Sequence, residues 1–104
     1  EDAGAQARDR LWSRLPRAML AYAQAAARDG DTEHALQTYF FVADQDPLAE
    51  AAFFGLMVTY SSRGQNAEAL RAYERCVLAL HAQLGTAPSE RLRTLAAALR
   101  ATPH

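Results

Sequence analysis

Residues 30–39 read GDTEHALQTY, and residues 64–73 read GQNAEALRAY. In both stretches a glycine comes first, an Ala-Leu pair follows after four residues, and a tyrosine ends the segment. Glycine tolerates the left-handed backbone that ends a helix, and the Ala-Leu-x-x-Tyr spacing puts the apolar residues on one face of the next helix. The offset of 34 residues between the two stretches therefore predicts two copies of a helix–turn–helix unit.

Apolar residues elsewhere in the chain follow the same offset, which relates Met19 to Phe53 and Val42 to Cys76. The chain shows no convincing period-two alternation flanked by hairpin turns, whereas apolar residues at helical spacing recur throughout. They form five stripes: Trp12, Leu15, Met19, Tyr22 and Ala26; Ala35, Leu36, Tyr39, Val42 and Ala43; Phe53, Leu56, Met57 and Tyr60; Ala69, Leu70, Tyr73, Val77, Leu80 and Leu84; and Leu92, Leu95, Ala96 and Leu99.

The period and the paired helices resemble the tetratricopeptide repeat. A single helix pair cannot bury both of its apolar faces, so a second pair must stack on it and a last helix must cover the open end. Small residues at Ala35 and Ala69 would let the helices approach closely, while Tyr39 and Tyr73 would fill the space beside them. We therefore expect an all-α, tetratricopeptide-like right-handed helical repeat of two helix hairpins plus a C-terminal capping helix.

Glycine and proline residues predict where the helices end. Gly30 and Gly64 stand where a glycine in the left-handed conformation would end the preceding helix, and Gly85 ends the fourth helix. Asp46-Pro47 ends the second helix, because the residue before a proline disfavours helical angles. No proline follows at the matching place in the second unit, so we expect the fourth helix to run on through Leu84.

Polar residues after these breaks predict where the helices begin. Asp31 or Thr32 can cap the second helix, Asn66 the fourth and Ser89 the fifth, since short polar side chains accept hydrogen bonds from the first backbone N–H groups. Pro16 lies inside the first stripe and predicts a kink or a break there.

The composition fits one small globular domain. The chain has 104 residues, of which 50% are hydrophobic and 22% charged, and no apolar run approaches the length of a membrane span. The formal net charge of −1 argues against a nucleic-acid-binding surface spread over the whole domain. A single cysteine, Cys76, excludes an internal disulfide.

Three separated motifs in the C-terminal half resemble the bacterial transcriptional activator domain. That family shows an ALR-x-YERC helix, then LG-x-x-PS, then a short last helix. The first repeat fits the family as well, so the resemblance covers about Leu11 to Leu99. The matching residues are Glu68–Cys76, Leu84-Gly85, Pro88-Ser89 and Leu92, together with Gly30-Asp31, Ala35 and Asp46-Pro47-Leu48.

The resemblance implies an all-α domain that acts by protein–protein contact and self-association, not by catalysis or base reading. Such domains usually follow a winged-helix DNA-binding domain in SARP-type antibiotic regulators and also occur in other signalling regulators. We expect residues 1–104 to form a single domain of a larger cytoplasmic regulator, with frayed ends at 1–10 and 101–104. We expect DNA contact only through a domain outside this chain, and no membrane partner.

Two surfaces are candidates for partner binding. In such repeats the first helix of each pair lines an inner groove, and its non-core residues here include Leu20, Gln24, Arg28, Phe54, Val58 and Ser61. Either a partner segment or neighbouring helices of the same chain fill this groove. Phe40 and Phe41 cannot both point inward on one helix, so one of them is exposed. In place of exposure to solvent, that residue could be covered by a second copy, giving a homodimer; the alternative is that the start of the first helix covers it.

Chemistry-bearing residues are scattered. His34, His81 and His104 stand far apart, and no usual zinc spacing exists with one cysteine. We expect a buried, inert thiol at Cys76, a core position for Trp12, and solvated faces for the arginine clusters at Arg8, Arg10, Arg14, Arg17 and at Arg91, Arg93, Arg100. We therefore expect no catalytic site, no metal and no cofactor. The alternative to a transcriptional interaction module is a generic tetratricopeptide scaffold that binds a peptide in its groove.

Overall fold

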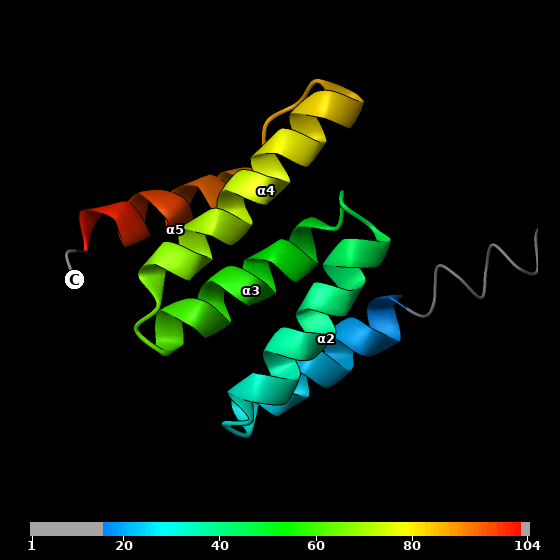
Figure 1. The fold of residues 1–104 in the computed structure, drawn as a ribbon, viewed down its shortest axis with the longest axis vertical. Coiled ribbons are helices and arrows are strands. Elements are labelled where there is room, and N and C mark those ends of the chain that lie inside the picture. Colours follow the sequence, from blue (N-terminus) through cyan, green and yellow to red (C-terminus); the bar gives the residue numbers. More distant parts are fainter. Residues whose placement is uncertain (1–15, 103–104) are drawn as a thin grey trace, which may run out of the picture.

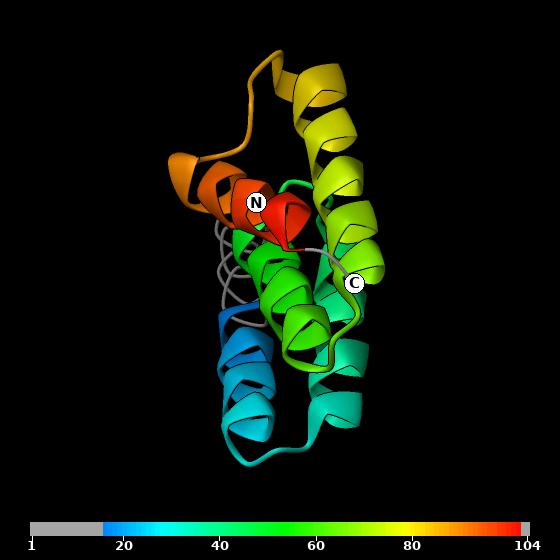
Figure 2. The same ribbon diagram turned by 90° about the vertical axis from the view of Figure 1, so that its left-hand side faces the viewer.

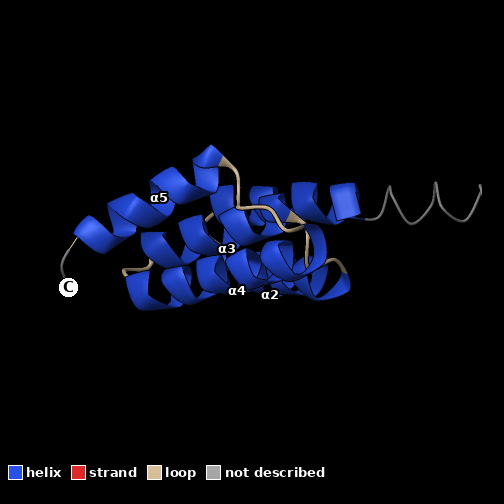
Figure 3. Cartoon of the chain, turned by 90° about the horizontal axis from the view of Figure 1, so that it is seen from above, coloured by secondary structure: helices blue, strands red, loops and turns tan. Residues whose placement is uncertain are grey.

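The fold is a stack of helices in every part of the chain that the structure, a computed structural model, describes, namely residues 16–102. Residues 16–28 are helical. They are followed by α2 (Thr32–Gln45), α3 (Glu50–Ser62), α4 (Asn66–Leu84) and α5 (Glu90–Ala101). No residue between 16 and 102 belongs to a strand (Figure 3). The all-α prediction is confirmed, and α4 runs to Leu84 as expected.

The helices form two antiparallel pairs and a final single helix. Residues 16–28 pair with α2, α3 pairs with α4, and α5 lies across the far side of the second pair (Figure 1). The loop after α4 returns along the molecule before α5 begins (Figure 2). Seen from above, α2 and α4 lie along one side, and we call them the outer helices (Figure 3). We call residues 16–28, α3 and α5 the inner helices. This is the predicted tetratricopeptide-like arrangement.

The turns at Gly30 and Gly64, each within a helix pair, share their closing hydrogen bonds. The N–H of Gly30 donates to the carbonyl of Ala27 at 3.1 Å, and the N–H of Gly64 donates to that of Ser61 at 3.0 Å. In both turns the next residue donates to the carbonyl five positions earlier, at 2.8 and 2.9 Å. Both glycines have positive φ, 84° and 75°, which side chains disfavour. The 34-residue period of the sequence is therefore a period of the backbone.

The start of α2 is capped as the sequence predicts. The Asp31 carboxylate accepts the backbone N–H of His34 at 3.3 Å and hydrogen-bonds the His34 ring Nδ1 at 2.7 Å. The side-chain hydrogen bond, followed by the backbone one, lowers the pKa of Asp31 below its usual value. This local pair fixes where the second helix begins.

The starts of α4 and α5 differ in detail from the prediction. Gln65, not Asn66, is the N-cap of α4, because its carbonyl already accepts the N–H of Ala69 at 3.1 Å and so draws Asn66 into the helix. Ser89 is the N-cap of α5, but its side chain makes no cap hydrogen bond. Its backbone N–H instead donates to the carboxylate of Glu50 on α3, at 2.8 Å.

The core lies on both sides of α3. Its sequence, EAAFFGLMVTYSS, is apolar on nearly every side, which is typical of a helix buried between neighbours. The predicted small and aromatic positions are buried in matching fashion in the two units, and together they include Ala35, Tyr39, Phe53, Leu56, Met57, Ala69, Tyr73, Cys76, Leu92 and Leu99.

Gly55, where α2 and α3 make a close contact, was not identified from the sequence. The Tyr39 ring lies directly over the Gly55 backbone, so that a Cβ atom built at position 55 would overlap the ring. Gly55 is therefore what lets the ring of one repeat pack on the central helix of the next.

Two predicted core residues are exposed. Tyr22 is 57% exposed although its counterpart one period later, Leu56, is fully buried. The first helical segment stands at the end of the stack, so the described helices cover only one of its faces, whereas α3 is covered from both sides. Leu84 is exposed because the last turn of α4 extends past α3 (Figure 1). Trp12 and the stripe before Pro16 lie outside the described residues, so the kink or break at Pro16 stays a prediction.

We expect Gly55→Ala to lower the free energy of unfolding by about 1–3 kcal/mol, because the added methyl group overlaps the Tyr39 ring and overpacks the core. Urea denaturation followed by circular dichroism measures the change. In a Tyr39→Val background, which removes the ring, the same substitution should cost nothing or stabilise α3 by about 0.5–1 kcal/mol through helix propensity. Equal costs in both backgrounds would contradict the role assigned to this contact.

Candidate functional site: the groove between the inner helices

An open groove of about 280 Å³ lies between the inner helices. Residues 16–28 and α3 supply most of its lining, and α2 and α5 contribute one residue each. We call this set the groove: Gln24, Ala27, Arg28, Tyr39, Ala51, Phe54, Gly55, Val58, Thr59 and Arg91. It opens to solvent on the side of the molecule opposite to the outer helices.

Phe54 and Val58 form an apolar strip on α3 within the groove. Val58 remains 42% exposed, whereas Phe54 is half-buried. The guanidinium of Arg91, on α5, lies 3.7 Å from the centre of the Phe54 ring. This is a close cation–π stack. We expected Arg91 to be on a solvated face; it is exposed, but it also covers one side of the aromatic ring.

A second hollow continues the groove along α5. Its volume is about 570 Å³, and it shares Phe54 and Arg91 with the groove. Its other lining residues are Glu90, Thr94, Leu95 and Ala98. Because the two hollows share residues, they form one continuous surface that runs from residues 16–28 across α3 to α5.

The structure brings together four of the eight predicted partner-binding residues: Gln24, Arg28, Phe54 and Val58 line the groove. Leu20 and Ser61 do not line it, and Leu20 is partly buried against the core. Sequence reasoning missed Gly55 and Thr59 on α3, and it missed Arg91 because the side of α5 that meets α3 depends on how the preceding loop returns.

Phe40 and Phe41 lie away from the groove, on α2. Phe40 is partly buried and meets the ring of Tyr60 edge-on, with centroids 6.1 Å apart. Phe41 is 50% exposed. The prediction that only one of the pair points inward is confirmed, and the helical segment 16–28 does not hide the other from solvent.

Phe41 has an apolar companion on the outer helices. Arg75 on α4 pairs with Asp44 on α2 at 2.5 Å, and Leu78 on α4 is 70% exposed. Phe41 lies three residues before Asp44 on α2, and Leu78 lies three residues after Arg75 on α4, so each is about one helical turn from the ion pair. We call Phe41 and Leu78 the outer patch.

The link between Glu50 and Ser89 positions α5 against the groove. The Glu50 carboxylate, in the first turn of α3, holds the backbone N–H at the N-terminus of α5. Pro88, just before it, is buried. The Arg93 side chain also donates to the Pro88 carbonyl, at 3.1 Å. These contacts fix the start of α5 beside α3, which places Arg91 over Phe54.

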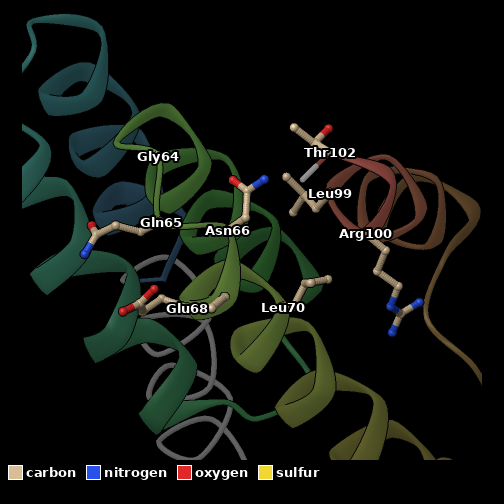
Figure 4. Close-up of a pocket in the computed structure, with 9 residues that line it drawn as sticks. Gly64, Gln65, Asn66, Glu68, Leu70, Leu99, Arg100 and Thr102 are labelled. Carbon is tan, nitrogen blue, oxygen red and sulfur yellow. The ribbon is translucent and has the colours of Figure 1, made fainter. Parts of the chain in front are cut away.

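A third hollow, of about 480 Å³, lies between the α3–α4 turn and the end of α5 (Figure 4). Asn66 points toward Leu99 and Thr102, whereas Gln65 and Glu68 point away from α5. The Gln65 Oε1 atom is buried and has no hydrogen-bond partner among the described residues. The polar groups around this hollow do not converge on one point, as they would in a ligand site.

Comparison with protein families decides the identity of the chain. The family described as the bacterial transcriptional activator domain matches residues 1–100. The chain belongs to this family. It is a regulatory domain of the transcriptional activator type, as the motifs of the sequence indicated. Comparisons with curated proteins and with solved structures returned no match.

The activator domain buries its one thiol. Cys76 has no exposed surface, and desolvation, followed by the negative charge of Glu50, raises its pKa to about 11. Among residues 16–102, no three His, Cys, Asp or Glu side chains are grouped as metal ligands would be. None of the helices in that range is long and apolar enough to cross a bilayer.

Cys76 should report on unfolding of the activator domain. A pKa raised from 9.0 to about 11 leaves about a hundredfold less thiolate at neutral pH, and burial blocks access as well. We expect iodoacetamide to modify the folded domain at least a hundredfold more slowly than the urea-unfolded chain. Between pH 9 and 11 only the unfolded thiol loses its proton, so stability should fall as the pH rises through that window. Equal reaction rates in both states would contradict the burial of Cys76.

Proposed function

We propose that this activator domain is a protein–protein interaction module of a bacterial transcriptional regulator, and that it binds a segment of another protein in the groove. One observation carries the proposal: the exposed Val58 and the Arg91-stacked Phe54 leave an apolar strip open between helices that are otherwise packed. Grooves of this kind accept peptide segments, with apolar anchors in the strip and polar contacts along the walls. Such contact takes place in the cytoplasm, where transcriptional regulators act.

The proposal involves no reaction. The polar side chains of the groove belong to Gln24, Arg28, Tyr39, Thr59 and Arg91. They include no carboxylate, histidine or cysteine that would serve as a general base or activated nucleophile. The groove is also open, whereas an active site commonly encloses most of its ligand. The function that these groups support is recognition of a protein surface.

Selection from a displayed library of random 12-residue peptides tests the groove. We expect clones retained by the wild-type domain to bind Val58→Arg at least tenfold more weakly, because the long charged side chain fills the apolar strip. Arg71→Glu, at an exposed position on α4 outside the groove, is the matched control and should bind them unchanged. Circular dichroism checks that both variants fold. Failure to retain clones, or clones equally well bound by Val58→Arg, would refute the proposal.

Self-association is a second candidate function, favoured by the outer patch. Phe41 and Leu78 expose large apolar surfaces about one helical turn from the charge-paired Arg75 and Asp44, and a symmetric contact would bury both. Burying a whole phenylalanine side chain is worth roughly 1.5–3 kcal/mol, and a symmetric contact would bury the exposed half of Phe41 from each copy.

Sedimentation velocity tests self-association. We expect the sedimentation coefficient of the wild-type domain to rise with concentration, and that of the double variant Phe41→Ser, Leu78→Ser to stay at the monomer value. Val58→Ser, at another exposed apolar position but in the groove, is the control and should behave as wild type. A wild-type domain that stays monomeric at every concentration would rule out the homodimer and leave the groove proposal intact.

A further inference from the structure

Charge is divided unevenly between the two sides of the molecule. The inner helices carry five arginines and two acidic residues, whereas the outer helices carry two arginines and four acidic residues. The chain as a whole is close to neutral, with a net charge of −1, so composition alone conceals this division. Of the five arginines on the inner helices, Arg28 and Arg91 line the groove, whereas Arg100 lies over the ring of Tyr73 on α4.

Arginines border the apolar strip of the groove from both walls. Arg28, at the end of the first helical segment, and Arg91, on α5, are the charged residues in the groove lining. Arg17 is exposed and lies on the same helical face as Gln24 and Arg28, at spacings of seven and four residues. Residues 16–28 contain no aspartate or glutamate. One wall of the groove is therefore basic along its described length.

The two arginines of the groove lining are not paired with carboxylates of the described residues. Neither Arg28 nor Arg91 takes part in an ion pair with any residue between 16 and 102; the ion pairs there involve His34, Arg63, Arg71 and Arg75. The acidic residues of the inner helices lie at the margins. Glu50 is engaged with the N-terminus of α5, and Glu90 lines the second hollow, along α5, but not the groove.

We propose that the groove binds an acidic peptide segment that carries bulky apolar side chains. This inference rests on the proposed function and names the chemistry of the partner. The apolar side chains of the segment lie on Phe54 and Val58, and its carboxylates meet Arg28 on one wall and Arg91 on the other. Arg91 keeps its stack on Phe54 while its outward N–H groups pair with a carboxylate, since a guanidinium offers both a face and a fork of donors.

Three labelled 12-residue peptides test the charge requirement by fluorescence anisotropy. The acidic peptide alternates Glu or Asp with Leu and Phe; its twins replace every acid by Gln or by Lys. We expect the acidic peptide to bind about tenfold more tightly than the Gln twin, as two exposed ion pairs allow, and the Lys twin to bind more weakly still. Raising the salt concentration should narrow these differences.

Charge reversal of the groove supplies the decisive variant. We expect Arg28→Glu combined with Arg91→Glu to invert the order, so that the Lys twin binds more tightly than the acidic peptide. Arg71→Glu is the control and should preserve the wild-type order, because Arg71 lies on an outer helix. Both substituted arginines are exposed, and circular dichroism confirms the fold of each variant.

Two results would overturn the inference: equal or absent binding of all three peptides by the wild-type domain, or an unchanged order in the charge-reversed variant. These results are distinct from a failure of the proposed function. If library clones require Val58 but carry no excess of acidic residues, the groove binds peptides and the charge inference alone fails.

Discussion

The burial of α3 on both of its sides is the constraint on which the rest of the structure depends. This helix packs against α2 through the contact between Tyr39 and Gly55, and against α4 of its own pair. A helix that is apolar on nearly every side is unstable at a protein surface. Each neighbouring helix is therefore held where it covers one face of α3. The repeat is thus a consequence of covering α3 twice, with similar turns at Gly30 and Gly64 supplying the reversals.

The groove exists because this covering is incomplete. The first helical segment and α5 approach α3 from opposite ends, and Phe54 and Val58 lie in the gap between them. The gap remains narrow because Glu50 ties the start of α5 to the start of α3. Within residues 16–102, α5 covers the far side of the second helix pair (Figure 1) and contributes Arg91 to the groove.

The same geometry separates charges that the sequence interleaves. Arginines and acidic residues alternate along the chain, but the inner helices gather the arginines and the outer helices gather the acids. The ion pairs between Asp44 and Arg75 and between Glu33 and Arg63 join neighbouring helices at the surface. Membership of the bacterial transcriptional activator domain family places this two-sided helical domain in transcriptional regulation.

The period, the helix ends and most of the core could be predicted from local patterns in the amino-acid sequence. Spacing, glycine and capping residues act within one or two helical turns, so Gly30, Asp31 and Gly85 could be placed without coordinates. Their local patterns also indicated the family. Half of the predicted partner-binding residues line the groove, because helical spacing alone identifies the face opposite to a core stripe.

Residue exposure, part of the groove lining and the contact at Gly55 depend on packing between segments that are far apart in the sequence. The exposure of Tyr22 and the burial of its counterpart Leu56 differ only because one helix ends the stack and the other is inside it. Arg91 lines the groove because the carboxylate of Glu50 holds the backbone of Ser89, 39 residues later in the sequence, at the start of α5. A glycine is required at position 55 because the Tyr39 ring, from the first helix pair, packs directly on the backbone there. These relations join residues that share no helical period, and no local pattern encodes them.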